Sequence, residues 1–316
     1  MFKEFAPRTV YLKEYQPPPW RIETVDLVFD LREQGTRVIS RLTLERNADY
    51  PGRPRELRLD GEELKPVWLR LDGSELHGED YRIDEEGLVL VDPPDRFVLE
   101  SEVEIAPECN TRLEGLYRSG GLFCTQCEAE GFRRITWYLD RPDVMARFNV
   151  RIEADRARYP VLLSNGNPLE AGELPGGRHY AVWDDPFPKP SYLFALVAGD
   201  LVHREEFFTT ASGREVRLRI YVEAENLDRC DHAMRSLVKA MRWDEEHYGR
   251  EYDLDVFNIV AVNDFNMGAM ENKGLNIFNS KYVLARPDTA TDADYQGIEA
   301  VVAHEYFHNW TGNRIT

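Results

Sequence analysis

The chain has 316 residues, 42% of them hydrophobic and 30% charged, which is typical of folded globular proteins and long enough for two or three domains. Asp and Glu number 57 against 39 Lys and Arg, and a net charge of −18 repels phosphate, so we expect no nucleic-acid partner. We find no run of about 20 apolar residues for a membrane helix and no apolar signal-peptide core at the start. The four cysteines do not make a disulfide scaffold. These features predict a cytoplasmic protein that is not bound to a membrane.

Residues 1–200 are predicted to form an antiparallel β domain, because short hydrophobic segments alternate with frequent Gly and Pro. A hairpin is expected around Gln34-Gly35, where hydrophobic residues recur at every second position on both sides. The same spacing predicts further strands at 57–59, 88–91, 97–105 and, beyond this domain, 216–222. The segment 186–190, Pro-Phe-Pro-Lys-Pro, predicts a rigid extended stretch near the end of the domain.

Residues 201–316 are expected to open an α/β domain, because the hydrophobic spacing becomes helical near Asn226. Asn226 is predicted to cap a helix that ends at Tyr248, with Gly249 as its stop. The buried stripe of this helix is expected to consist of Cys230, Met234, Leu237, Met241 and Tyr248. A buried strand is predicted at 256–262.

A second helix is predicted over 292–310, with Thr291 and Asp294 as a capping pair and Gly312 as the stop. It contains the run 304–308, His-Glu-Tyr-Phe-His, directly after four apolar residues. This arrangement predicts that the run lies in the middle of a buried helix.

The run 304–308 is typical of a zinc site. His304 and His308 are four residues apart, so both imidazoles lie on one helical face and can bind one Zn²⁺ ion. Glu305 would face the open position of the metal and take a proton from the water that the zinc activates. A catalytic zinc usually has three protein ligands. No feature marks His203, His232 or His247 as the third, so we expect that ligand beyond Thr316.

A second motif stands upstream of the zinc motif: 266–272 is Asn-Met-Gly-Ala-Met-Glu-Asn, with Glu271 33 positions before His304. Gly-Ala-Met-Glu-Asn followed by His-Glu-x-x-His resembles the zinc-dependent gluzincin aminopeptidases. The runs 265–285 and 304–314, together with Cys-Thr-Gln-Cys-Glu-Ala-Glu-Gly-Phe-Arg-Arg at 124–134, are similar to the bacterial aminopeptidase N group of that family. The resemblance covers nearly the whole chain. It implies an α+β, multi-domain fold: a saddle-like antiparallel β domain, then an incomplete thermolysin-like zinc domain.

The resemblance also implies roles for individual residues. His304 and His308 match the zinc ligands, and Glu305 matches the catalytic base. Glu271 matches the acid that grips the free α-amine of the substrate, and the residues of the first domain that match its helpers are Gln126 and Glu128. The remaining positions match the segment that lines the bound peptide, and they are Met267, Gly268, Ala269, Met270 and Asn272.

The implied activity is zinc-dependent release of N-terminal amino acids from peptides that have a free N-terminus. The third zinc ligand of the family, a Glu, and its transition-state Tyr come later in the sequence, so we expect both beyond residue 316. We therefore expect this chain by itself to have weak activity or none. We also expect a monomer.

Several alternatives stay open at this level. Taken alone, Glu271 would be a solvated loop acid, and Glu130 would be as good a candidate as Glu128. The Cys124-x-x-Cys127 pair suits a redox pair or half of a thiolate zinc site, but the chain has no second such pair, so we expect a structural role. Two other functions compete with the aminopeptidase: a thermolysin-like endopeptidase, which would need neither 268–272 nor Glu128, and a non-catalytic peptide-binding module.

Overall fold

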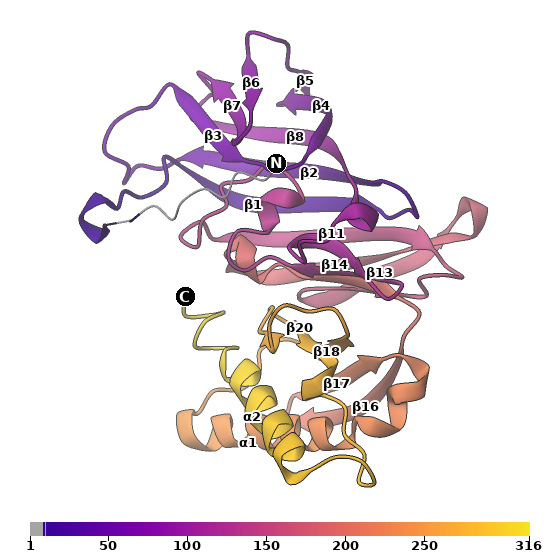
Figure 1. Ribbon diagram of the computed structural model, residues 1–316. Coiled ribbons are helices and arrows are strands. Elements are labelled where there is room, and N and C mark those ends of the chain that lie inside the picture. Colours follow the sequence, from indigo (N-terminus) through magenta and orange to yellow (C-terminus); the bar gives the residue numbers. More distant parts are fainter. Residues whose placement is uncertain (1–8, 10) are drawn as a thin grey trace.

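The computed structural model describes residue 9 and residues 11–316. One part is a stack of β-sheets, and the other is a smaller sheet with two helices (Figure 1). The first eight residues, where we expect no signal peptide, lie outside the described residues. No helix in the described part is long and apolar enough to span a bilayer.

The largest sheet has eight strands in the order β13-β14-β11-β1-β2-β8-β4-β5. The strands are β1 (Trp20–Asp30), β2 (Thr36–Arg46), β4 (Lys65–Leu71), β5 (Ser74–Glu75), β8 (Arg96–Ile105), β11 (Ala146–Asp155), β13 (Asn167–Leu174) and β14 (Arg178–Lys189). All neighbours are antiparallel except β1 and β11, which pair in parallel. The predicted hairpin around Gln34-Gly35 is confirmed as β1 and β2, in which alternate side chains are buried.

Two smaller sheets complete the β part, in the orders β12-β15-β10-β9 and β3-β7-β6. Their strands are β3 (Glu56–Asp60), β6 (Tyr81–Asp84), β7 (Gly87–Val91), β9 (Gly115–Ser119), β10 (Leu122–Gln126), β12 (Val161–Ser164) and β15 (Leu196–Gly199). A cluster of buried phenylalanines has ring centroids 5.2 to 6.1 Å apart and joins elements distant in sequence. Its members are Phe29, Phe132, Phe148 and Phe194. The predicted β domain is confirmed.

The proline-rich segment 186–190 is extended, as predicted, but most of it belongs to strand β14. Opposite Ala146 and Phe148 of β11, the pairing register of β14 shifts between Asp185 and Lys189. Pro186 and Pro188 lie inside this irregularity, where a missing N–H group interrupts no regular hydrogen bond. The prolines are therefore tolerated within an inner strand.

The second part contains a five-stranded mixed sheet in the order β16-β17-β18-β20-β19. The strands are β16 (Val202–Thr209), β17 (Glu215–Val222), β18 (Val256–Val262), β19 (Ala269–Met270) and β20 (Leu275–Asn279). The three central strands are parallel, and every residue of β18 is buried, as its continuous apolar sequence predicts. Figure 1 shows helices α1 (Asp231–Tyr248) and α2 (Asp292–Phe307) beside this sheet.

Helix α1 differs from the prediction at its start. It begins at Asp231, and 224–229 forms a separate 3₁₀ helix, so Asn226 does not cap α1. The amide of Asn226 instead contacts the Glu223 carboxylate at 3.5 Å. The stop at Gly249 is confirmed by its left-handed φ of 62°. The stripe of buried residues is confirmed except for Tyr248, which is exposed and contacts the rings of Trp243 and Phe307.

Helix α2 has the predicted capping box between Thr291 and Asp294. It ends at Phe307, however, and not near Trp310, so the run 304–308 lies at the C-terminal end of the helix and not in its middle. The chain leaves the helix there because the residues after His308 form hydrogen bonds with other parts of the protein. Gly312 lies in the following turn at a φ of 136°.

Candidate active site

His304 and His308 face each other at the end of α2. Their Nε2 atoms are 3.1 Å apart, and their rings are nearly perpendicular. The Nδ1 atom of His308 donates to the carbonyl of Thr311 at 2.8 Å, so its Nε2 atom is left with a lone pair. Two nitrogens bound to one tetrahedral zinc at about 2.0–2.1 Å are roughly 3.3 Å apart. The two rings therefore fit one metal ion.

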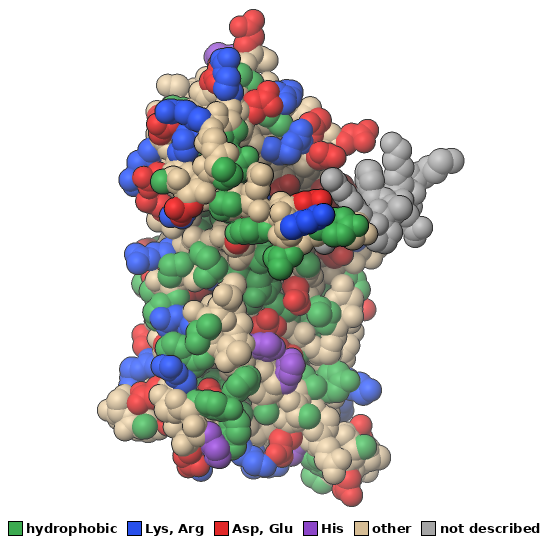
Figure 2. Space-filling view, turned by 90° about the vertical axis from the view of Figure 1, so that its left-hand side faces the viewer, with side chains coloured by type: hydrophobic (Ala, Val, Ile, Leu, Met, Phe, Trp, Pro, Cys, Tyr) green, Lys and Arg blue, Asp and Glu red, His purple; other side chains and the backbone are tan. Residues whose placement is uncertain are grey.

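The described residues contain no cluster of three or more His, Cys, Asp or Glu side chains that could hold a metal. The histidine and acidic side chains that gather on one face are visible in Figure 2.

Three carboxylates share the surroundings of the histidine pair. Glu305 is buried, and burial, followed by the charges of Glu271 and Glu128, raises its pKa to about 8. The pKa of Glu128, an exposed side chain, is also raised, first by partial desolvation and then by Glu271, while His308 lowers it. The structure thus brings the predicted base and both predicted amine-binding acids together. Burial and mutual repulsion oppose the ionisation of these acids, and a cation, either a metal ion or an ammonium group, would relieve that repulsion.

The loop with Glu271 is positioned by the edge of the five-stranded sheet. β19 pairs with β20 on one side only, and the Gly268 carbonyl accepts a hydrogen bond from the Asn279 N–H at 3.0 Å. A Cβ atom on Gly268 would lie 3.2 Å from the Tyr282 ring, so a larger residue here would require that ring to move by a few tenths of an ångström. The free edge of β19 has the geometry to pair with an extended peptide.

Two side chains of this loop point into the protein. Met270 is fully buried in the hydrophobic core, so a bound peptide would meet its backbone and not its side chain. Asn272 is also buried, and neither atom of its side-chain amide has a hydrogen-bond partner among the described residues. Met267 is 41% exposed at the entrance to the loop.

The β part reaches the site through the end of β10. Gln126 is buried, its Nε2 atom lies 2.9 Å from the sulfur of Met267, and its Oε1 atom has no partner among the described residues. The chain then turns tightly, with the Gly131 N–H donating to the Cys127 carbonyl. A Cβ atom on Gly131 would lie 2.4 Å from the Gln126 carbonyl, so this turn requires glycine. The turn places Glu128 beside the loop of Glu271.

Sequence reasoning missed three residues near the site. The amide of Asn313 donates to the Glu271 carbonyl at 2.8 Å, and Lys273 is buried directly after the loop. Both lie inside the runs that carry the family resemblance, which was the available signal. Tyr192 is half-buried, and its pKa is raised by burial and by Glu271, so its ring lies near the acids. No pattern in the sequence marked Tyr192.

The two cysteines near Gln126 are free and buried. Burial raises the pKa of Cys124 to about 12 and that of Cys127 well above its usual value. These thiols form part of the core, in agreement with the structural role that we expected.

Comparisons with known proteins agree with this description. The model of the peptidase M1 N-terminal domain matches residues 82–193, and the model of the peptidase family M1 domain matches 232–316. Aminopeptidase N of Caulobacter vibrioides is 60% identical over 98% of this chain, and aminopeptidase N of Escherichia coli is 56% identical over 98%. The chain belongs to peptidase family M1.

A solved structure confirms the fold. The crystal structure of Legionella pneumophila aminopeptidase A in complex with aspartic acid matches 96% of this chain at 37% identity, with a TM-score of 0.92. The chain covers 36% of that structure, and it spans 36% and 35% of the two curated relatives. The expected fold class, a β-sheet domain followed by the start of a catalytic-type domain, is confirmed.

Proposed function

We propose that the protein containing this chain is a zinc-dependent aminopeptidase that releases N-terminal amino acids from peptides. The observation that carries the proposal is the pair of Nε2 atoms 3.1 Å apart beside three clustered carboxylates. The names of the M1 relatives support the same activity. The aspartic acid in the Legionella structure is a free amino acid, which suits a pocket that accepts an α-amine.

In this proposal His304 and His308 would hold one zinc ion. The chemistry that such an ion supplies when bound is Lewis-acid activation of water and of a carbonyl group. Glu305 stands between these histidines in sequence and is buried beside them. A cation held by the histidines would favour the carboxylate form of Glu305, which would then serve as the base that accepts a proton from the attacking water. The same carboxyl group then delivers the proton to the leaving amine.

Glu271, with help from Glu128 and Gln126, binds the terminal ammonium of the substrate. Charge-assisted hydrogen bonds of this kind contribute about 1.5–3 kcal/mol each. An internal peptide segment has no ammonium and would leave these acids desolvated and unpaired. The acids therefore select the chain start, and the free edge of β19 aligns the residues that follow.

The proposal is tested on the complete protein with one peptide in two forms, with a free N-terminus and N-acetylated, while mass spectrometry follows the products. We expect stepwise loss of residues from the free form alone, abolished by a chelator and restored by Zn²⁺. Internal cleavage of the acetylated form would establish an endopeptidase instead. Binding of the free form without cleavage would establish a peptide-binding module.

A further inference from the structure

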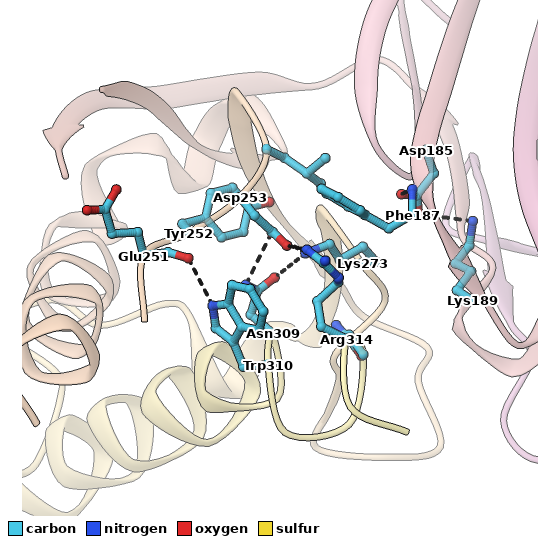
Figure 3. A network of polar contacts seen from close by, with 12 residues as sticks. Asp185, Phe187, Lys189, Glu251, Tyr252, Asp253, Lys273, Asn309, Trp310 and Arg314 are labelled. Atoms are coloured by element: carbon cyan, nitrogen blue, oxygen red, sulfur yellow. Dashed lines mark hydrogen bonds and ion pairs between the residues drawn. The ribbon is translucent and has the colours of Figure 1, made fainter. Parts of the chain in front are cut away.

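A buried lysine lies where the two motifs of the site meet. Lys273 follows Glu271 by two residues and is only 1% exposed. Its ammonium group forms an ion pair with Asp253 and donates to the side-chain oxygen of Asn309 at 2.7 Å (Figure 3). Asn309 directly follows His308. The ammonium group of Lys273 thus contacts Asn309, the residue that follows His308. Lys273 itself belongs to the loop that carries Glu271.

Asp253 connects the same lysine to the turn after α2. One carboxylate oxygen of Asp253 pairs with Lys273, and the other pairs with Arg314. The guanidinium of Arg314 lies 3.7 Å above the ring of Phe187 from β14, which belongs to the β part. The indole N–H of Trp310 donates to the Glu251 carbonyl at 2.9 Å. The turn after α2 is therefore held from several directions (Figure 3).

The backbone of Lys273 is held as well. Its carbonyl accepts a hydrogen bond at 2.9 Å from the buried amide of Asn165, which also donates to the Leu193 carbonyl at 2.9 Å. Both Asn165 and Leu193 lie in the β part. Lys273 consequently joins three regions: the loop of Glu271, the end of α2 and the β part.

Stability alone is a poor explanation for this buried ion pair. Burial of an ammonium group is costly, and burial is the main effect that lowers the pKa of Lys273, while Asp253 raises it. Well-packed apolar side chains often replace buried ion pairs without loss of stability. An apolar side chain at this position would not form the directional hydrogen bond and ion pair that connect the loop of Glu271 to the end of α2.

We propose that Lys273 is a positioning residue that sets the distance between the Glu271 carboxylate and the metal-binding pair His304 and His308. That distance defines where the substrate ammonium lies relative to the bond that is cleaved. The inference rests on the proposed function and deepens it. Lys273 acts through Glu271 and the helix end, without contacting the substrate.

The test uses two inhibitors and the complete protein. L-Leucine hydroxamate has both a metal-binding group and an α-amine, whereas 4-methylpentanoyl hydroxamate has only the metal-binding group. The ratio of their dissociation constants, measured by calorimetry, reports whether Glu271 and the metal site are correctly spaced. Wild-type protein is expected to prefer the amine-containing inhibitor by at least tenfold. Lys273→Met is expected to lose most of that preference, so that the ratio of the two dissociation constants falls by about tenfold toward one, the lower end of the range usual for residues that orient a site.

Lys189→Met is the matched control. Lys189 is also 1% exposed, and it pairs with Asp185 at 3.1 Å and lies 3.9 Å above the ring of Phe148. None of its contacts among the described residues is with Glu271, Asn309 or the two histidines, and its connection to the Lys273 contacts is indirect, through Asp185 and Phe187. The variant should keep the wild-type preference, even where its melting temperature falls as far as that of Lys273→Met.

The outcomes separate the two proposals. No preference in the wild-type protein would overturn the amine-anchoring function and this inference together. An unchanged preference in Lys273→Met, or an equal loss in Lys189→Met, would overturn the inference alone. If Lys273→Met does not fold, Asp253→Asn removes the counter-charge of Lys273 and is judged by the same ratio. Hydrogen exchange, independent of activity, should increase in both 266–273 and 309–314, and an increase in only one of them would also contradict the inference.

Discussion

The β part and the α/β part both contribute to the candidate site, but they position their side chains differently. The two histidines of the α/β part are four residues apart, His304 in the last turn of α2 and His308 as its C-cap with helical backbone angles, so local helical geometry brings their rings together. The β part supplies Gln126 and Glu128 from a strand end and a tight turn. Their distance from the histidines depends on how two separate parts of the chain pack, so it is set by tertiary contacts.

The two parts also differ in how deeply their acidic side chains are buried. Glu305 is 6% exposed on the α/β side, whereas Glu128 is exposed on the β side and Glu271 is intermediate. A buried group has its charge and orientation fixed by its surroundings, while an exposed acid is screened by solvent. We therefore expect substitutions to matter most for Glu305, less for Glu271 and least for Glu128.

Replacement of Glu305 by Gln should have the largest effect. The amide keeps the shape of the side chain but cannot accept the proton, so we expect kcat to fall by about 10²–10⁴-fold with zinc content unchanged. Steady-state kinetics and metal analysis on the complete protein measure both quantities. Glu299→Gln is the control, because Glu299 lies on the same helix and pairs with Lys239 at the surface. Activity near the wild-type level in Glu305→Gln would show that Glu305 is not the general base.

Replacement of Glu271 by Gln tests the amine anchor. Loss of one charge-assisted hydrogen bond of about 1.5–3 kcal/mol corresponds to about a 10- to 150-fold loss of kcat/KM for substrates with a free amine. Glu128→Gln should cost about fivefold or less, because exposed ion pairs contribute about 0.2–1 kcal/mol. Kinetics of both variants with one aminoacyl p-nitroanilide make the comparison. A larger loss of kcat/KM for Glu128→Gln than for Glu271→Gln would show that the β part supplies the stronger contact to the substrate amine.

Local rules account for what the sequence predicted well. The alternation in β1 and β2, the capping box of α2 and the continuous apolar run of β18 depend on neighbours within a few residues. The histidine pair depends on the same local geometry. The positions of Gln126 and Glu128 could be predicted only through the family resemblance, since nothing local distinguishes Glu128 from Glu130.

The errors arose where tertiary contacts outweigh local signals. Gly312 is a reasonable helix stop, yet α2 ends at Phe307 because Asn309 and Trp310 bond to the lysine and to the loop before β18. Asn226 is a reasonable cap, yet it lies in a 3₁₀ helix. Lys273 looks like a surface residue in the sequence, since lysine is rarely buried unless paired. Its partner Asp253 is 20 residues away, so no local pattern reveals the pair.

The smallest predicted effect is the difference in chemical labelling between exposed and buried cysteine thiols of the β part. It also tests how tightly that part is packed. With its pKa raised to about 12, Cys124 would be thiolate in only about one molecule in ten thousand at pH 8, because the thiolate fraction falls tenfold per pH unit below the pKa. Cys109 is exposed. Iodoacetamide at pH 8 should therefore label Cys109 in the folded protein and leave Cys124 and Cys127 unlabelled until denaturant is added, as peptide mass mapping can show. Rapid labelling of the buried pair would mean that the turn before Glu128 opens in solution, and the redox interpretation of Cys-x-x-Cys would have to be reconsidered.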